Sequence, residues 1–294
     1  MKKTSGRTGR SSASSADAVL PDARALDAER ALRDLFSGFG SVLVAFSGGV
    51  DSAYLAWLAH DVLGERALAV TALSESYPAH HYDLALTLAR QAGFPHEVVH
   101  TREIDRPEYR ANPVNRCYYC KDELYTVLGG LARERGLSVI VDGNNADDRG
   151  DHRPGRQAAR EAGVRSPLDE VGLDKPSIRA LAHRAGLPQW DEPASACLSS
   201  RIPYQSEVTD EKLRTIEAAE RALRAIGFRV CRVRHHESLA RIEIGRDELS
   251  RALEPDVRDR IVKELRALGY QHVTIDLQGY RMGSLNEGVR LHPA

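Results

Sequence analysis

A glycine-rich loop near the start of the chain, residues 47–52 with the sequence SGGVDS, has the residues of an anion-binding site. It follows an apolar run over residues 42–46 that predicts a buried parallel strand, and a helical pattern begins directly after it. A glycine turn between a strand and a helix directs backbone N–H groups and the positive end of the helix dipole at one point. The loop therefore predicts a site for a phosphate-bearing ligand.

The side chains of this loop extend the prediction. Gly48 and Gly49 let the backbone approach an anion without a Cβ clash, and Ser47 and Ser52 add hydroxyl donors. Asp51 would repel bound phosphates unless Mg²⁺ lies between them. No Gly-Lys-Ser/Thr follows, so this is not the lysine-bearing nucleotide loop. The alternative is a glycine turn that only joins a strand to a helix.

Three of the four cysteines have spacings that suit chemistry. Cys117 and Cys120 lie in NPVNRCYYCKDELY, between Pro113 and a helical pattern, and Cys197 lies in ASACLSSRIPY. A redox pair would need its own βαβ context at the start of a helix. A zinc site would need two further ligands, for which Cys197 and a histidine could serve. An iron–sulfur cluster held by three thiolates would leave one iron open. Two unrelated buried thiols are the remaining alternative.

Residues that suit an anion follow Cys197 directly. Ser199, Ser200 and Arg201 form a compact anion-binding group, in which the Arg201 guanidinium can bind a phosphate through two parallel hydrogen bonds. The alternative is an ordinary loop capped by serines.

Alternating arginines mark a predicted hairpin in the last third of the chain. Arg232 and Arg234 share one face of the run FRVCRVR, while Arg241 and Glu243 lie on the predicted partner strand. Cationic residues on one face suit an anionic small ligand, with Glu243 orienting an arginine. The alternative is a solvated, salt-bridged sheet face. Cys231, in the same run, is predicted to be a half-buried thiol that behaves as a small hydrophobe.

The bulk composition sets limits on the protein class. A chain of 294 residues can bury a full core and favours two modest domains over one. The formal net charge of −1 argues against a chain that binds polyanions over its whole surface. No apolar run approaches the roughly 20 residues that cross a bilayer, and no signal-peptide core is present. Four cysteines are too few for a disulfide scaffold, so a soluble protein in the reducing cytoplasm is expected.

Strands and helices alternate through the first two thirds of the chain. Residues 1–20 are rich in Ser, Arg and Lys and predict a disordered tail; a transit peptide is the alternative, but an amphipathic stripe is missing. Strands are expected at 42–46, 67–72, 96–100 and 138–141, with helices at 23–36, 82–92, 121–135, 156–161 and 177–185. This alternation predicts an α/β domain over residues 21–204, with a doubly wound parallel sheet. Ligands of such sheets bind at the carboxyl ends of the strands, which groups residues 47–52, 71–77, 142–148 and the segment after 100.

The pattern changes near residues 204–206. An amphipathic helix over 208–226, a hairpin of 228–234 with 239–244, helices at 246–253 and 255–268, and a strand at 272–277 are expected. This mixture predicts a smaller C-terminal α+β domain over residues 205–294.

Two levels of resemblance accompany these motifs. SGGVDS is the signature of the PP-loop ATP pyrophosphatases, which release pyrophosphate and leave an adenylylated substrate. The chain as a whole resembles the LarE family of ATP-dependent sulfur transferases from about Ala31 to Glu287. The matching stretches are VAFSGGVDS, NRCYYCKDELY, VDGNNADDRGDHRPG, SACLSSRIPY, RVRHHESLARIEI and TIDLQGYRMGSLNE.

The resemblance implies a step in making the nickel-pincer nucleotide cofactor of lactate racemase. It implies that ATP adenylylates the carboxylates of a pyridinium-3,5-dicarboxylate mononucleotide, which are then converted to thiocarboxylates. By matched position it implies ATP at Ser47, Gly48, Gly49, Asp51 and Ser52 with Mg²⁺ on Asp51, substrate at Ser200, Arg201, Glu220, Arg232, Arg234 and Glu243, and sulfur chemistry at Cys117, Cys120 and Cys197.

The cysteines separate two kinds of family member. Some carry one cysteine that gives up its own sulfur, whereas others carry a CxxC pair and one more cysteine that hold a 4Fe-4S cluster. This chain resembles the second kind through Cys117, Cys120 and Cys197. The resemblance then implies an open iron that binds an extra sulfide, which attacks the adenylate.

Two other functions stay open at this stage. A tRNA 2-thiolation enzyme of the same superfamily also uses three cysteines around a cluster, but the near-neutral charge and the lack of a recognisable RNA-binding module argue against it. An adenylate-binding or iron–sulfur scaffold protein is the non-catalytic alternative. The expected partners are a small nucleotide substrate and a sulfur donor, without nucleic acid or membrane, and the family's tendency to form multimers predicts a homo-oligomer.

Overall fold

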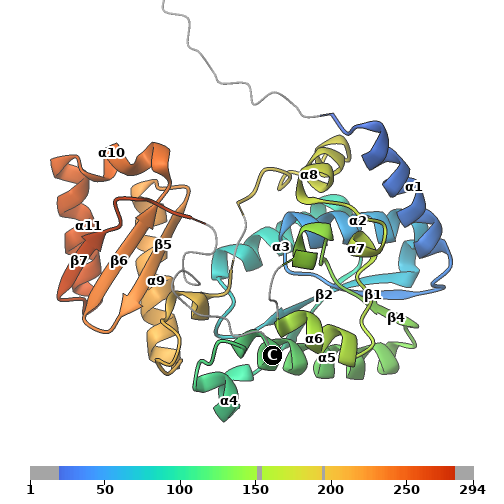
Figure 1. Cartoon of the computed structure of the whole chain (residues 1–294), viewed down its shortest axis with the longest axis horizontal. Helices are drawn as coiled ribbons and strands as arrows, with labels where there is room; N and C mark the ends of the chain where they lie inside the picture. The colour runs from blue at the N-terminus through green and yellow to red at the C-terminus, as the bar shows by residue number, and fades with distance from the viewer. Residues whose placement is uncertain (1–19, 151–153, 194–195, 282–294) are drawn as a thin grey trace, which may run out of the picture.

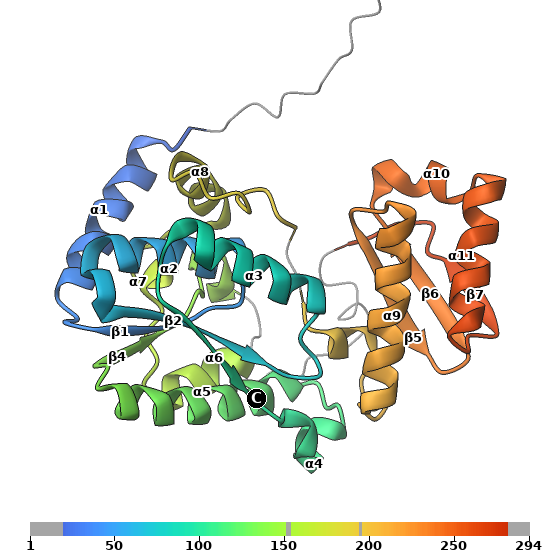
Figure 2. The same ribbon diagram turned by 180° about the vertical axis from the view of Figure 1, so that it is seen from behind.

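The computed structural model describes residues 20–150, 154–193 and 196–281, which form two units (Figures 1 and 2). The larger, N-terminal unit contains a four-stranded sheet in the order β3-β2-β1-β4. All three neighbouring pairs in this sheet are parallel. Its strands are β1 (Val42–Ala45), β2 (Ala67–Leu73), β3 (His96–His100) and β4 (Val139–Val141).

The connections between the strands place the loop of residues 47–52 at a topological switch point. From β1 the chain runs through helix α2 (Val50–Leu63) to β2, and through α3 (Ala79–Ala92) to β3 on the same side. It then returns through α5 (Arg116–Arg135) to β4, on the other side of β1. The loops after β1 and β4 therefore diverge at adjacent carboxyl ends, where open α/β sheets bind ligands.

Helices cover both faces of this sheet (Figure 1). One face packs against α1 (Ala23–Ser37), α2, α3, α7 (Pro167–Glu170) and α8 (Lys175–Arg184). The other face packs against α5 and α6 (Pro154–Glu161). Helix α2 is apolar on most sides because it lies between the sheet and helices α1 and α8, so it lacks the polar face of a surface helix.

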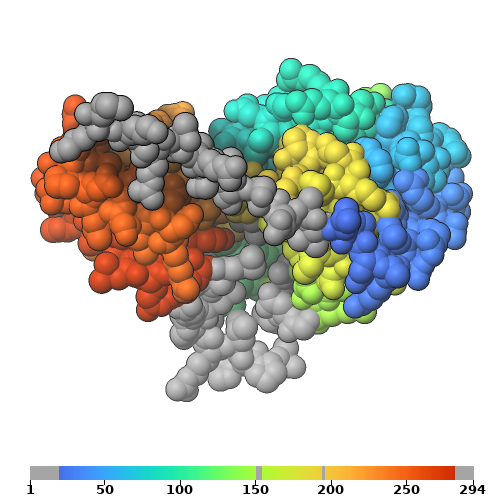
Figure 3. All heavy atoms as spheres, turned by 90° about the horizontal axis from the view of Figure 1, so that it is seen from above, coloured from blue at the N-terminus to red at the C-terminus, as the bar shows by residue number. Residues whose placement is uncertain are grey.

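The smaller unit contains α9 (Asp210–Ile226), β5 (Cys231–His236), β6 (Leu239–Ile244), α10 (Leu249–Ala252), α11 (Pro255–Ala267) and β7 (His272–Ile275). β5 pairs with β6 antiparallel, and β6 pairs with β7 parallel. The apolar residues of α9 and α11 pack on one face of this sheet. The opposite face carries Arg232, Arg234 and Glu243, so the alternation along each strand separates a core face from a polar face. Seen from above, the two units form separate lobes (Figure 3).

The segment between the two units is fastened to the N-terminal unit by Asn112. This side chain is fully buried, and its Nδ2 donates to the carbonyls of Pro203 and Ser206 at 2.8 and 2.9 Å. The Asn112 carbonyl in turn accepts from the Gln205 N–H at 2.9 Å. Asn112 itself adopts a left-handed backbone with φ of 53°, a region that asparagine tolerates better than most residues.

The predicted fold class is confirmed, while the limits of several elements differ from the prediction. Helix α5 begins at Arg116, so Cys117 and Cys120 lie inside its first turns rather than before the helix. The helix predicted over 246–253 is a 3₁₀ turn, Arg246–Glu248, followed by the single turn of α10. The predicted domain limits remain predictions, and the tail of residues 1–19 lies outside the described residues. Among the described helices, none is both long enough and apolar enough to span a bilayer.

Candidate functional site

Cys197 lies directly before a short 3₁₀ turn, η4 (Leu198–Arg201). Hydrogen bonds from both units hold the main chain of this turn. The Leu198 N–H donates to the Ser76 carbonyl at 2.8 Å. Nη1 of Arg116 donates to the Ser199 carbonyl at 3.0 Å, and Nη1 of Arg234 donates to the Ser200 carbonyl at 2.7 Å. Segments from both units therefore fix the backbone of this turn, whatever side chains it carries.

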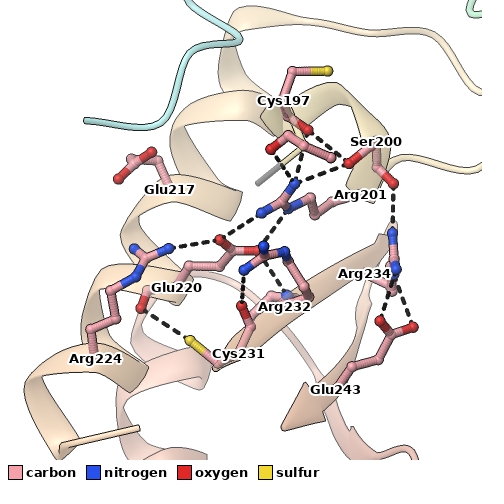
Figure 4. A network of polar contacts seen from close by, with 12 residues as sticks. Cys197, Ser200, Arg201, Glu217, Glu220, Arg224, Cys231, Arg232, Arg234 and Glu243 are labelled. Carbon is pink, nitrogen blue, oxygen red and sulfur yellow. Dashed lines mark hydrogen bonds and ion pairs between the residues drawn. The ribbon is translucent and has the colours of Figure 1, made fainter. Parts of the chain in front are cut away.

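Arg201 is buried and is engaged by protein groups (Figure 4). Its Nε and Nη2 donate to the two carboxylate oxygens of Glu220 at 2.8 and 3.1 Å, and both side chains are 0% exposed. Its Nη1 donates to the carbonyls of Ala196 and Cys197 at 2.7 and 2.9 Å. The prediction that Arg201 binds the substrate phosphate stays a prediction; the observed contacts make Arg201 a residue that positions the Cys197 segment.

Glu220 also closes the free edge of β5. Its Oε1 accepts from the Val233 N–H at 3.1 Å, and its Oε2 accepts from Arg224 Nη2 at 3.1 Å. Burial opposes the charge on Glu220, but Arg201 and the other nearby guanidiniums outweigh it and lower the pKa of this carboxyl. Glu220 therefore stays ionised and organises three elements around one carboxylate.

The arginines predicted on β5 face the same turn. Arg234 forms a two-bond contact with Glu243 at 2.9 and 2.8 Å, which agrees with the predicted orienting role of Glu243. The Arg232 guanidinium lies over the Tyr280 ring, 5.1 Å from its centroid, and donates to the Cys231 carbonyl at 2.8 Å. Burial, together with the charge of Arg201, lowers the pKa of Arg232. A bound anion would relieve this repulsion between buried cations.

The three predicted cysteines lie close together. Burial raises the pKa of the Cys117 thiol, and the neighbouring Cys197 raises it further. Burial, Glu103, Cys197 and Cys117 raise the pKa of Cys120 in the same way. Cys117 is an exposed residue, and the nearby Arg116 and Lys121 oppose the rise in the pKa of its thiol. Two helix residues and the η4 segment therefore form one sulfur group.

The spacing of this sulfur group bears on what it can hold. Among the described residues, only His80, His81 and Glu192 bring three metal-ligating atoms within 4.8 Å of one another. At least one pair of the three cysteine sulfurs therefore lies more than 4.8 Å apart, which is wider than the about 3.8 Å that zinc–sulfur bonds of about 2.3 Å give in a tetrahedral site.

Glu103, which sequence reasoning missed, contacts the sulfur group. It is buried, and its Oε1 accepts from the hydroxyls of Ser74 and Ser76 at 2.7 Å each. The same oxygen lies 4.0 Å from Cys120 Sγ. The available signal was an acidic residue just after the carboxyl end of β3, where the topology places ligand-binding segments.

The SGGVDS loop is shaped by its own hydroxyls and by close packing. Ser52 Oγ accepts from the Ser47 N–H and donates to the Gly49 carbonyl, both at 3.1 Å. Gly48 has φ of +70°, and an added Cβ would lie 3.0 Å from the Ala85 Cβ and 3.1 Å from the His81 carbonyl oxygen. The turn thus depends on glycine for both its backbone conformation and its packing.

We expect Gly48→Ala to destabilise the protein by about 1–3 kcal/mol, because alanine at this φ is strained and its methyl group meets α3. Thermal unfolding followed by circular dichroism measures the change. Gly130→Ala is the matched control. Gly130 lies inside α5 with open space around it, so this substitution should stabilise the protein by about 0.5–1 kcal/mol. Equal melting temperatures for wild type and Gly48→Ala would contradict the account.

Asp51 lies in a polar group that suits a cation beside phosphates. Its Oδ2 accepts from Lys175 Nζ at 2.6 Å and from Asn145 Nδ2 at 3.4 Å. Its Oδ1 is buried and has no hydrogen-bond partner. Burial and nearby Asp148 raise the pKa of Asp51, which Lys175 partly offsets. An unsatisfied carboxylate oxygen next to a second carboxylate is the donor set that Mg²⁺ prefers. Lys175 and Asp148 were not predicted as site residues.

One segment joins the loop to the sulfur group. The Tyr77 hydroxyl donates to the Ser47 carbonyl at 2.8 Å, while the neighbouring Ser76 carbonyl accepts from Leu198 and its hydroxyl contacts Glu103. Residues 74–77 therefore contact the glycine loop, the η4 turn and the Glu103 carboxylate. The segments predicted to group at the strand ends do come together.

Several known proteins are similar in sequence to this chain. Residues 30–112 match the family described as NAD synthase. An uncharacterized protein of Synechocystis sp. is 44% identical over 255 residues, 87% of this chain and 95% of that protein. A pyridinium-3,5-bisthiocarboxylic acid mononucleotide synthase of Lactiplantibacillus plantarum is 37% identical over 87% of this chain and 91% of its own length. An uncharacterized protein of Methanocaldococcus jannaschii is 28% identical over 82% and 90%.

The match to the L. plantarum synthase covers both units and the sequence between them. It extends far beyond the part of the chain that the NAD synthase family describes, which ends before the cysteines. The match to the NAD synthase family covers part of the parallel sheet, including its glycine loop. The match to the synthase covers 87% of this chain. The chain therefore belongs to the LarE family of sulfurtransferases, with a PP-loop domain as its N-terminal unit.

Proposed function

We propose that this enzyme uses ATP to convert the carboxylates of a pyridinium-3,5-biscarboxylic acid mononucleotide to thiocarboxylates, in the biosynthesis of the nickel-pincer nucleotide. The observation that carries the proposal is the segment 74–77, which contacts both the glycine loop and the turn beside Cys197. Activation of a carboxylate and delivery of sulfur need two sites within reach of one substrate. The name of the L. plantarum relative supplies the substrate class.

The proposed reaction has two balanced steps. A substrate carboxylate oxygen attacks the α-phosphorus of ATP, which forms the acyl–O–P bond and releases pyrophosphate. Sulfide then attacks the acyl carbon, and the C–O bond to AMP breaks, so the thiocarboxylate and AMP leave. Adenylation makes this second step feasible because AMP is a far better leaving group than the oxygen of a free carboxylate.

The N-terminal loop would hold ATP in the first step. Backbone N–H groups around Gly48 and Gly49, with the start of α2, would bind its phosphates, and Asp51 would hold Mg²⁺. The unpartnered Oδ1 of Asp51 supports this role, because a buried carboxylate oxygen without a donor is costly unless an ion occupies the site.

The sulfur group would hold a 4Fe-4S cluster through Cys117, Cys120 and Cys197. When bound, such a cluster supplies an iron without a protein thiolate, at which an extra sulfide can be carried. The grouping of the three cysteines and the buried Arg116 beside them support the assignment, since cationic side chains stabilise thiolates. The protein's own part is to fix the three sulfurs on α5 and on the backbone-held η4 turn.

Arg232 and Arg234 would bind the phosphate of the mononucleotide, with Ser200 as a hydroxyl donor. Both guanidiniums lie on the polar face of β5, and Arg234 reaches the η4 backbone. This arrangement would place the phosphate at the C-terminal unit and the pyridinium ring toward the cysteines.

Anaerobic incubation with ATP, Mg²⁺, sulfide and the pyridinium mononucleotide tests the proposed function. Mass spectrometry should show oxygen-to-sulfur exchange in the substrate, with one AMP and one pyrophosphate released per exchange. Sulfur transfer to tRNA instead, with salt-dependent tRNA binding, would support a tRNA thiolation enzyme and reject the proposal. ATP consumption without sulfur transfer to the mononucleotide or to tRNA would also reject the proposal.

Asp51→Asn is expected to lower pyrophosphate release by about 10²–10³-fold, the loss typical of removing one charge-stabilising group. The amide keeps the size of the carboxylate but cannot neutralise Mg²⁺. Asp61→Asn is the matched control, because Asp61 is an exposed residue at the far end of α2. The rates are measured by a coupled pyrophosphate assay; an unchanged rate in Asp51→Asn would remove Mg²⁺ from this residue.

Two further expectations stay predictions. The cytoplasmic location can be checked by cell fractionation. The homo-oligomer can be checked by light scattering after size-exclusion chromatography, where a monomeric mass would contradict it.

A further inference from the structure

A second group of metal-ligating side chains lies apart from the cysteines. His80 and His81 are the second and third residues of α3, and Glu192 lies in the turn that follows α8. One ligand atom from each of the three lies within 4.8 Å of the other two. The two imidazole rings have centroids 3.9 Å apart and meet edge to face at 63°. Side chains of adjacent helix residues normally diverge, so this convergence is unusual.

Two side chains of this group have atoms without a hydrogen-bond partner in the described part of the chain. His80 Nδ1 is buried and has no hydrogen-bond partner. In the described part of the chain, the Glu192 carboxylate likewise makes no hydrogen bond or ion pair. A buried polar atom without a partner costs about 1–3 kcal/mol, and coordination to a metal ion would remove that cost.

The imidazoles are in the form that binds metals. Burial, the neighbouring His81 and nearby arginines lower the pKa of His80 to about 3. Burial and nearby arginines lower the pKa of His81 to about 4. Both rings are therefore neutral over the physiological range, which metal coordination requires. Glu192 differs in that burial raises the pKa of its carboxyl.

The charges around this group decide which ions fit. Arg201, Arg224 and Arg232 lie nearby, and Glu220 neutralises part of their charge. Such surroundings repel a cation that is held by charge alone, so Mg²⁺ and Ca²⁺ are disfavoured. Zn²⁺, Co²⁺ and Ni²⁺ form strong bonds to imidazole, which can outweigh the repulsion.

We propose that His80, His81 and Glu192 bind one divalent transition-metal ion, with water completing its coordination. The main chain of Glu192 is already held, because its N–H donates to the Gln189 carbonyl at 3.0 Å and its carbonyl accepts from Arg179 Nη2 at 2.8 Å. Glu192 precedes Cys197 by five residues. The ion would therefore fasten the turn that carries Glu192 onto α3. The site is separate from the proposed sulfur transfer and does not depend on it.

Cobalt titration of a chain in which Cys117, Cys120 and Cys197 are replaced by serine tests the site without competition from thiolates. We expect one Co²⁺ per chain, with weak visible ligand-field bands and without the intense near-ultraviolet band of cobalt–thiolate bonds. Zn²⁺ should displace the cobalt, whereas Mg²⁺ should not. Binding that appears only when the cysteines are present would assign the metal to the sulfur group and overturn the proposal.

Single substitutions locate the ligands. His80→Ala and Glu192→Gln should each weaken Co²⁺ binding at least about 10-fold, as loss of groups around a metal commonly does. His272→Ala is the matched control, because His272 is an exposed histidine on β7. Zn²⁺ should also raise the melting temperature of the parent chain but not that of Glu192→Gln, which separates lost binding from lost folding. Equal cobalt affinities in parent, His80→Ala and Glu192→Gln chains would reject the site.

Discussion

Cys197→Ser is expected to abolish oxygen-to-sulfur exchange while pyrophosphate release from ATP continues. The serine oxygen cannot replace a thiolate in a three-cysteine cluster site, but the glycine loop that would bind ATP lies on another segment. Ser76, Arg116 and Arg234 form hydrogen bonds to main-chain atoms of η4, so the turn should keep its place in the variant. Mass spectrometry of the product and a pyrophosphate assay separate the two activities.

The colour of the protein gives an independent measurement for the same variant. Anaerobically purified wild-type protein should be brown, with a broad visible absorption band that Cys197→Ser lacks. Cys231→Ala is the matched control: Cys231 is buried in the C-terminal core, where burial raises the pKa of its thiol to about 12, and it should keep both colour and activity. A colourless wild-type protein with one zinc ion per chain would contradict the cluster.

Arg201→Met is expected to lower the free energy of unfolding by about 3–5 kcal/mol, the usual cost of removing one partner of a buried ion pair. Glu220 would remain buried without its two-bond partner, although Arg224 and Arg232 lie nearby, and the carbonyls of Ala196 and Cys197 would lose their donor. Urea denaturation measures the loss. Because this arginine also fixes the Cys197 segment, sulfur transfer should fall even in protein that remains folded.

The double variant Arg201→Met with Glu220→Leu is the informative comparison for this pair. It removes both buried charges, so it should be more stable than Arg201→Met alone, although Val233 loses its acceptor. Arg214→Met is the matched control, since Arg214 is exposed on the same helix α9 and should change stability by less than about 0.5 kcal/mol. Equal stabilities of Arg201→Met and Arg214→Met would show that the ion pair of Arg201 with Glu220 does not hold the two units together.

The fold of the N-terminal unit could be predicted because each strand is a short apolar run with its own turn signal. Runs such as residues 42–46 and 138–141 have few alternative structures, and parallel strands follow from the helices between them. The start of α5 could not be predicted in this way. Its first turns contain two cysteines and two tyrosines without a side-chain cap at Asn115, so tertiary contacts such as that of Arg116 with Ser199 select the helix.

The residue types of the candidate site were predictable from motifs, but their contacts were not. Arg201 carries the charge expected of a phosphate ligand, yet its actual partner, Glu220, lies 19 residues away on a helix of the other unit. Glu103 and Lys175 belong to segments without a recognisable motif, and only the folded chain brings them beside Cys120 and Asp51. The sequence contains no sign of a site at His80 and His81 because Glu192 lies more than a hundred residues away in the chain.

The way the η4 turn is held has a consequence for how this enzyme family can diverge. Among the described residues, the hydrogen bonds from other elements to residues 197–200 end on carbonyl or N–H groups of this segment, apart from the contact of the Ser199 hydroxyl with the Tyr109 hydroxyl at 2.6 Å. A mutation at position 197 is therefore expected to change the side chain without moving the backbone. Under the proposed function, descendants of one ancestor can change the sulfur-bearing residue at this position and keep the same activating loop.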